Sequence, residues 1–173
     1  MSVFSNWDIY NVIAEHVIEA LQADSVLGSG GGDEIATWDA ETRETAAEYN
    51  DFELPAIAVE VIHSGQEINP LSLHTTAVYG ATMWITTGGD ATLETVKQTA
   101  KRIGARVERT MRQQNRPAKQ ISDLPTDLEG AATDGVKVTN LQFDVDGGVI
   151  NNVTRGIGRV ICEITIDFKP TID

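Results

Sequence analysis

The chain has 173 residues, of which 41% are hydrophobic, and a formal net charge of −13. This length fits a single domain over residues 1–173, and the apolar content excludes a disordered acidic tail, which would lack the groups needed to form a core. The negative charge argues against a general attraction to nucleic acid or anionic membranes, and no apolar run approaches the roughly 18 residues of a membrane span.

The first predicted element is an amphipathic helix over residues 5–24. Its start fits an N-cap at Ser5, because a serine side chain can accept a hydrogen bond from the first turn. Gly-rich residues 27–34 end it, and residues 35–51 are predicted as a loop or arm with a short strand near Trp38. The helix presents one apolar face, made of Ile9, Val12, Ile13, Val17, Ala20 and Leu21.

Two strands follow this arm. From Pro55 onward, Ile57, Val59 and Val61 alternate with small or polar residues, which is the pattern of a strand with one buried face. Residues 63–75 are predicted as a connector, and residues 76–87 alternate again. The two strands are therefore expected to pair as an antiparallel hairpin.

A second helix is predicted after the break at residues 88–90, with Asp90 as its N-cap and Pro117 as its latest end. Gly104 within it costs up to about 1 kcal/mol relative to Ala, so we expect this glycine to mark a close packing contact. Every third or fourth position of the helix is apolar: Leu93, Val96, Ala100, Ile103, Val107 and Met111.

The last third of the chain is predicted as a loop over residues 121–135 and two strands. Residues 136–146 change phase around Asn140, which indicates a bulge, and residues 146–148 read as a turn. The final strand alternates regularly, with Val160, Cys162, Ile164, Ile166 and Phe168 on one side. The fold class is thus α+β, in the order α-β-β-α-β-β, with two helices packed on a mainly antiparallel four-stranded sheet.

Positive charge is concentrated in residues 97–119, which hold eight of the thirteen Lys and Arg residues and one acid. On a helical wheel these cations form an outward stripe opposite the apolar face. The stripe can be a solvated face tied to acidic neighbours, a contact with an acidic surface of another subunit, or a nucleic-acid site. Bases stack on aromatic side chains, and the helix has none. The candidate interface residues are Lys101, Arg102, Arg106, Arg109, Arg112 and Arg116.

No catalytic, cofactor or metal site is predicted. The GSGGGDE loop lacks the Lys-Ser/Thr ending of a phosphate loop, and His16, His63 and His74 lack metal-ligand spacing. Residues 144–147 (DVDG) resemble the start of a calcium loop, but Arg155 stands where its twelfth residue, a glutamate, belongs. Cys162 fits a buried structural thiol. We therefore expect a protein that is not an enzyme.

The pattern of the whole chain resembles the tail-terminator and tail-completion proteins of long-tailed phages and related archaeal viruses. The resemblance lies in the element order, in LPAIAVEV at residues 54–61, in TLETVKQTAKRIGARVERTM at residues 92–111, and in NVTRG before the last strand. It implies a structural protein of the virion tail or neck, assembled in the host cytoplasm. Such a protein forms a ring, usually a hexamer, that ends growth of the tail tube and joins the tail to the head connector.

The resemblance also implies that DNA passes through the ring without specific binding, and that residues 27–34, 63–75 and 121–135 become ordered on docking to the tube and connector. One alternative is a head-completion or adaptor protein of the neck. Another, of a different class, is a small nucleic-acid-binding protein that uses the basic helix of residues 97–116. The excess of acids also suits a host that lives in concentrated salt.

Overall fold

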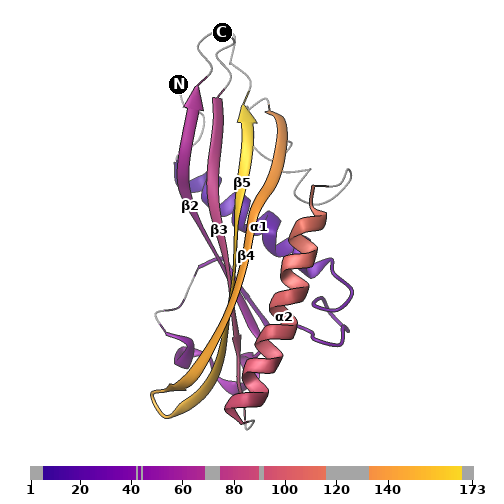
Figure 1. The fold of residues 1–173 in the computed structure, drawn as a ribbon, viewed down its shortest axis with the longest axis vertical. Helices are drawn as coiled ribbons and strands as arrows, with labels where there is room; N and C mark the ends of the chain where they lie inside the picture. The colour runs from indigo at the N-terminus through magenta and orange to yellow at the C-terminus, as the bar shows by residue number, and fades with distance from the viewer. Residues whose placement is uncertain are drawn as a thin grey trace.

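The computed structural model describes residues 6–41, 43, 45–68, 75–89, 92–115 and 133–168. Two α-helices cover one face of a strongly twisted five-stranded sheet (Figure 1), so the α+β class and the two helices are confirmed. The helices are α1 (Asn6–Gln22) and α2 (Leu93–Gln113), and two short 3-10 helices are η1 (Ala46–Glu48) and η2 (Asp51–Glu53). The strands are β1 (Thr37–Asp39), β2 (Ala56–Ile68), β3 (Thr75–Thr87), β4 (Thr133–Ile150) and β5 (Val153–Phe168).

The strand order across the sheet is β1-β2-β3-β5-β4. The pairs β2–β3, β3–β5 and β5–β4 are antiparallel, which confirms the predicted hairpin of β2 and β3. The short strand predicted near Trp38 is confirmed as β1, but the predicted count of four strands in the sheet is wrong, because β1 joins the sheet as a fifth strand parallel to β2. This strand is only three residues long, too short for alternation to reveal how it pairs.

The ends of the strands differ from the prediction at two places. Residues 63–68 continue β2 and do not belong to a connector, because a bulge between His63 and Gly65 shifts the register and hides the alternation. Residues 146–148 continue β4 and do not form a turn. The chain turns instead at Asn151 and Asn152, whose φ angles of 48° and 65° suit a two-residue hairpin. Strand β4 also begins earlier than expected, at Thr133, while residues 121–132 lie outside the described residues.

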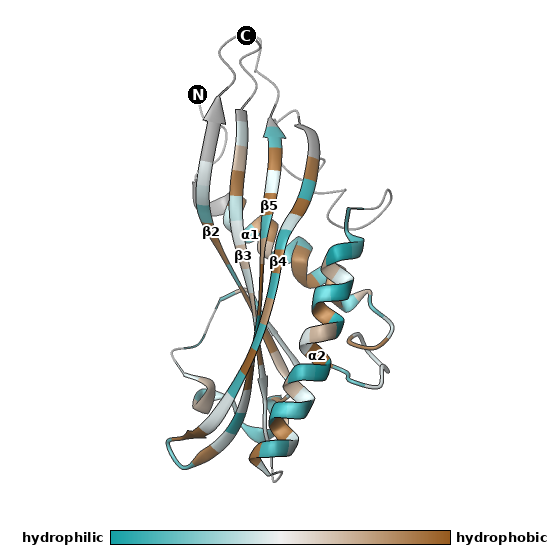
Figure 2. Ribbon diagram, in the orientation of Figure 1, coloured by the Kyte–Doolittle hydropathy of each residue, from teal (hydrophilic) through white to brown (hydrophobic). Residues whose placement is uncertain are grey.

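The core lies between the two helices and one face of the sheet. Hydrophobic positions recur along the twisted strands and along α1 and α2 (Figure 2). The predicted bulge near Asn140 is confirmed by a register shift between Thr139 and Gln142 and by a φ angle of 53°. The close contact expected at Gly104 is also confirmed, because a Cβ there would overlap the ring of Phe143. These two features place α2 directly on β4.

The N-cap of helix α2 lies two residues after the predicted one, Asp90. It is Thr92, whose Oγ1 accepts a hydrogen bond from the Thr95 amide at 3.3 Å, so the predicted cap is wrong. The helix ends at Gln113, inside the limit set by Pro117. The cap predicted for α1, Ser5, lies outside the described residues.

Candidate interaction surfaces

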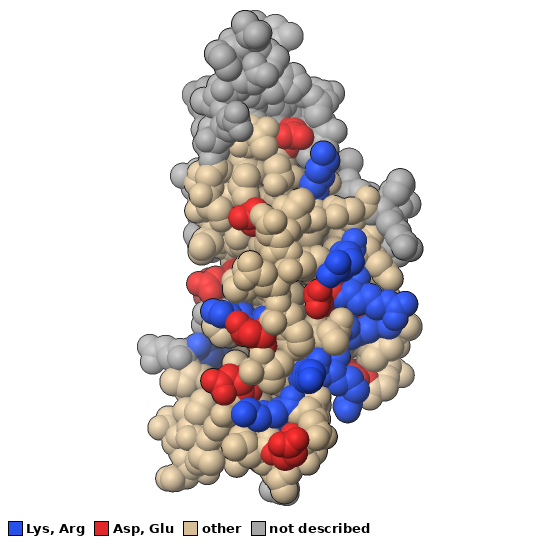
Figure 3. Space-filling view, in the orientation of Figure 1, with Lys and Arg blue, Asp and Glu red and all other residues tan. Residues whose placement is uncertain are grey.

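Helix α2 turns its buried residues toward the sheet and its basic stripe toward solvent (Figure 3). The structure describes Lys101, Arg102, Arg106, Arg109 and Arg112 of the predicted stripe, whereas Arg116 lies outside the described residues. All five project from the outer surface of the helix, and Arg106 is the least exposed of them. The wheel therefore placed the stripe correctly, but the partners of each cation depend on the fold.

Arg106 is bound to Asp24, which follows the end of α1. Its Nε lies 2.9 Å from both carboxylate oxygens of Asp24, and the hydroxyl of Thr110 donates to the same carboxylate. Burial alone would raise the pKa of Asp24, but hydrogen bonds from Arg106, the Val26 amide and Thr110 lower it overall. Asp24 thus joins the end of α1 to α2.

Arg102 makes a second link of the same kind, with its Nε 2.8 Å from Oδ2 of Asp33. The hydrogen bond from Arg102 lowers the pKa of Asp33. The loop between the two links is also held by its own backbone. The Asp33 amide donates to the Val26 carbonyl, and the Ile35 amide donates to the Leu27 carbonyl. The Leu27 side chain is fully buried. These contacts argue against the expectation that residues 27–34 become ordered only on docking.

The rest of the stripe is differently placed. Arg112 pairs with Glu108 one turn away on the same helix. Within the described part of the chain, Lys97, Lys101 and Arg109 have no hydrogen-bond or carboxylate partner. The interpretation of a solvated face tied to acidic neighbours therefore fits Arg102, Arg106 and Arg112, and leaves the other cations available to a partner.

The sheet face opposite the helices is the second candidate surface. Neither α1 nor α2 covers it, and its described side chains include apolar, polar and charged residues. Trp84 lies on the middle strand, β3, where its Nε1 donates to Glu60 at 3.3 Å and the Arg159 guanidinium lies 5.6 Å from its ring centroid. Arg159 in turn pairs with Asp144 on β4. We call this surface the open face.

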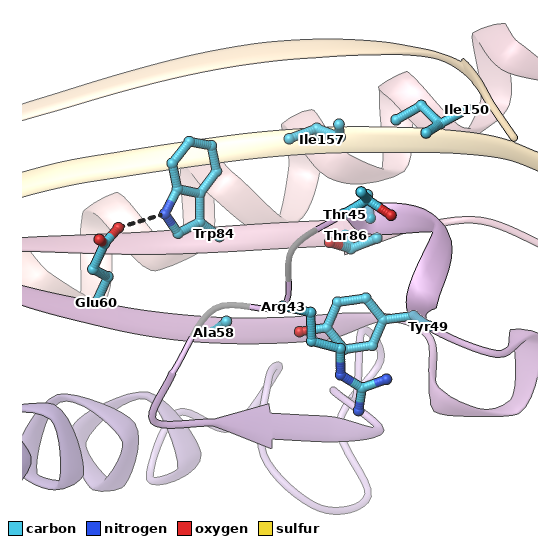
Figure 4. Close-up of a pocket in the computed structure, with 10 residues that line it drawn as sticks. Arg43, Thr45, Tyr49, Ala58, Glu60, Trp84, Thr86, Ile150 and Ile157 are labelled. Atoms are coloured by element: carbon cyan, nitrogen blue, oxygen red, sulfur yellow. Dashed lines mark hydrogen bonds between the residues drawn. The ribbon is translucent and has the colours of Figure 1, made fainter.

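A cleft of about 500 Å³ opens at one end of the open face (Figure 4). Its walls come from β2, β3, the β4–β5 hairpin and the segment that follows β1. Glu60 and Trp84 stand at one end of the cleft, and Tyr49 and Arg43 close the other. The ten lining residues are Arg43, Thr45, Ala46, Tyr49, Ala58, Glu60, Trp84, Thr86, Ile150 and Ile157.

Arg43 holds the segment beside the cleft in place. Its guanidinium lies 4.0 Å from the ring centroid of Tyr49 and donates to both carboxylate oxygens of Glu53, at 2.9 and 3.1 Å. The hydrogen bond from Arg43 lowers the pKa of Glu53 to about 2. Burial, together with a hydrogen bond to Asp39, raises the pKa of Tyr49. Arg43, Tyr49 and Glu53 each have a partner within this segment, so none of these three side chains is a free nucleophile or base in the cleft.

Sequence reasoning missed the role of Arg155, which is only 2% exposed. Its Nη2 donates to the Tyr49 carbonyl at 2.8 Å and its Nε to the Ala46 carbonyl at 3.3 Å, so it fixes the segment after β1 to the start of β5. The neighbouring Gly156 has no room for a side chain, because a Cβ would meet the Val96 carbonyl and the Thr87 hydroxyl. The Arg-Gly pair, which the sequence placed before the last strand and which the structure places within the start of β5, was the available signal.

The structure also locates the cysteine and two of the three histidines that the sequence offered as candidates for chemistry. Cys162 is buried as predicted, and desolvation raises the pKa of its thiol to about 12. His16 is buried, His63 packs edge-on against Tyr79, and His74 lies outside the described residues. Over the described ranges, no three His, Cys, Asp or Glu side chains are grouped as a metal site. No described helix is both long and apolar enough to cross a membrane.

Comparison with known proteins assigns no family. No protein-family model matches the chain, and no curated protein matches it. Among solved structures, a chain of the virion of a native gene transfer agent particle is similar, with 13% sequence identity and a TM-score of 0.48 over 94% of this chain and 99% of that chain. A similarity at this level does not transfer a function.

Proposed function

We propose that this chain is a structural subunit of a phage-like virion. Its copies form a ring of six, the usual number for tail terminators, and the ring caps the tail tube. The observation that supports this most directly is the pair of unlike surfaces left uncovered by the fold. One is the open face, and the other is the side of α2 that carries Lys97, Lys101 and Arg109 without partners in the described structure. Both are suited to contacts with other chains.

A ring uses two different patches of one chain. In a heterologous ring each subunit shows one patch to the neighbour before it and another to the neighbour after it, so a basic patch can meet an acidic one around the whole circle. Lys101 and Arg109 supply the basic patch, since they are exposed. The remainder of this acidic chain supplies the other.

The open face is suited to a channel for DNA. If it faces the lumen, its acids repel phosphates, whereas a positive lumen would retain them. Its described charged side chains comprise the acids Glu60, Asp144, Asp146, Glu163 and Asp167 and the bases Lys137 and Arg159. The tail tube protein and the head-tail connector would then contact the two ends of the ring.

The test is the absolute mass of the purified protein by light scattering at low and molar salt, followed by negative-stain imaging. A hexamer has six times the subunit mass of 18.7 kDa. Changing both Lys101→Glu and Arg109→Glu is expected to lower the mass of the assembly at low salt without unfolding the subunit, because neither side chain has a partner within its own described chain.

The control is Gln113→Glu, which adds an acid on the same helix without removing a cation or breaking a contact within the described chain. Reversal of Arg102 or Arg106 is unsuitable as a test, because it breaks contacts with Asp33 and Asp24 within the subunit. A chain that stays at 18.7 kDa in both salts contradicts the ring. If it also binds DNA with an affinity that falls steeply with salt, the basic helix is a nucleic-acid site instead.

A further inference from the structure

The end of the sheet that holds the cleft also carries the two most exposed large apolar side chains of the described structure. Phe52, on η2, is 83% exposed, and Val149, near the β4–β5 turn, is 67% exposed. Val149 lies opposite Thr154 at the start of β5, and η2 leads directly into the start of β2. This end is the lower one in Figure 1. We call the surface formed by η1, η2, the cleft and the β4–β5 turn the hairpin end.

The segment that presents Phe52 is fixed on both sides. Asp51 pairs with buried Arg155 at 3.3 Å, and the Glu53 carboxylate accepts two hydrogen bonds from Arg43. A side chain presented by a preorganised segment binds with a smaller loss of conformational freedom, so more of its contact energy is retained. Aromatic residues are also enriched at protein interfaces. Phe52 thus has the character of an anchor for another protein.

The cleft beside this segment has apolar walls and one available charge. Of its two charged lining residues, Arg43 is bound to Glu53, whereas Glu60 is exposed and has no cation partner in the described ranges. Lysine and arginine side chains place their hydrocarbon stems along apolar surface and keep the charge at the tip. The cleft therefore suits such a side chain, with its tip at Glu60. The apolar lining residues are Ala46, Ala58, Trp84, Ile150 and Ile157.

The surroundings of the cleft are negative as well. Glu48 belongs to η1, whose first residue lines the cleft, and Asp146 lies opposite the lining residue Ile157. Both acids are exposed, and neither pairs with a cation in the part of the chain that the structure describes. Opposite charge favours a basic partner here, and the phosphates of nucleic acid would be repelled.

Position distinguishes this surface from the contacts between copies. In a ring whose axis runs roughly along the strands, neighbouring copies meet side to side, and the ends of the strands form the two ends of the ring. The hairpin end is one of these ends, because β2 starts there, β3 ends there and β4 turns into β5 there. The protein that contacts it is then a different chain and not a second copy.

We propose that the hairpin end is the docking surface for an adjoining protein of the particle, which inserts a lysine or arginine side chain into the cleft toward Glu60 and packs apolar side chains against Phe52. This inference rests on the proposed function, because it takes the partner from the two proteins that meet the ends of the ring. It adds which end of the subunit makes the contact and what chemistry the partner presents there.

Binding of the purified chain to the tail tube protein and, separately, to the head-tail connector of the same particle tests this surface. Each of the two is immobilised, and the dissociation constant is measured by biolayer interferometry at low and at molar salt. One of them is expected to bind the natural chain, and Phe52→Ser and Glu60→Gln should each weaken binding at least about tenfold, as loss of an interface anchor does. Glu60→Gln removes the charge but keeps an oxygen that can accept from Trp84. Its effect should shrink in molar salt, because ions screen the lost attraction.

Two variants serve as matched controls. Ile62→Ser removes an apolar side chain that is 58% exposed and does not line the cleft. Glu19→Gln removes an exposed acid on α1, far from the hairpin end. Both should bind the partner as the natural chain does. Light scattering should give the same assembly mass for all four variants, because the hairpin end lies outside the contacts between copies.

The outcomes separate the docking surface from the ring. A ring that binds neither protein, or that binds one of them equally well with Phe52→Ser or with Glu60→Gln, overturns the inference while the proposed ring stands. A chain that remains at 18.7 kDa but binds one of the two proteins through Phe52 and Glu60 supports the surface and overturns the ring. A chain that remains at 18.7 kDa and binds neither overturns both.

Discussion

At the scale of single residues, the packing of the interior depends on a few positions where only one type of side chain fits its neighbours. Gly104 is one of them, because α2 lies so close to β4 that the Phe143 ring fills the space of a Cβ. Arg155 is another, because its buried guanidinium satisfies the carbonyls of Ala46 and Tyr49. Both positions look unfavourable when the local sequence is considered alone.

Gly104→Ala is expected to destabilise the protein although alanine favours the helix by up to about 1 kcal/mol. The methyl group overlaps the Phe143 ring, and overpacking of this kind typically costs about 1–3 kcal/mol. The measurement is the urea midpoint of unfolding. Adding Phe143→Leu should recover part of the loss. A single variant more stable than the natural chain would show that α2 moves away from β4 easily.

Acid is expected to weaken the contact between Arg43 and Glu53. The folded-state pKa of Glu53, about 2, lies below its usual value of 4.5. A lowered pKa stabilises the fold above the usual value, and this stabilisation is lost as the pH falls from about 4.5 to about 2. Protection factors for hydrogen exchange at residues 45–53, which correct for the acid dependence of the intrinsic exchange rate, should therefore fall over this range.

The matched comparison for this acid effect is Arg43→Gln, which removes the cause of the lowered pKa. Its protection factors at residues 45–53 should already be low at neutral pH and should change less with acid. Arg112→Gln, on the exposed face of α2, should behave like the natural chain. Identical acid profiles for all three proteins would mean that Arg43 does not hold this segment.

At the scale of elements, the cations of α2 fall into two groups with different roles. Arg102 and Arg106 bind the loop that follows α1, and so they hold the two helices in register. Lys101 and Arg109 have no such role in the described structure and remain available for contact with another chain. Substitutions only a turn apart should therefore have different effects.

Arg106→Gln is expected to lower the free energy of unfolding by about 1–3 kcal/mol, because it leaves a carboxylate without its charged partner. Asp24 is well shielded from solvent, with a side chain that is 8% exposed. Arg109→Gln on the same helix should change stability by less than about 0.5 kcal/mol, as is usual for exposed positions. Urea unfolding of both variants measures the difference, and equal values would contradict the division of the helix.

At the scale of the whole molecule, the net charge of −13 sets the response to salt. Like charges repel one another across the surface, and added ions screen this repulsion. The thermal midpoint should therefore rise between 0.1 and 1 M salt. A midpoint that stays constant or falls would argue against adaptation to a high-salt host, and would show that the ion pairs of α2 matter more than the overall charge.

The sequence by itself determined both helices, the four longer strands, the bulge near Asn140 and the outward stripe of α2, because each of these leaves a local periodicity. Only the tertiary structure decided that the short strand near Trp38 joins the sheet beside β2, that β2 and β4 continue through apparent breaks, and which carboxylates bind Arg102 and Arg106. Those features depend on partners distant along the chain, such as Pro55 for the start of β1 and Asp24 for Arg106. Local patterns contain the preferences of a segment, but the partner that satisfies its hydrogen bonds and charges is chosen when the segments pack together.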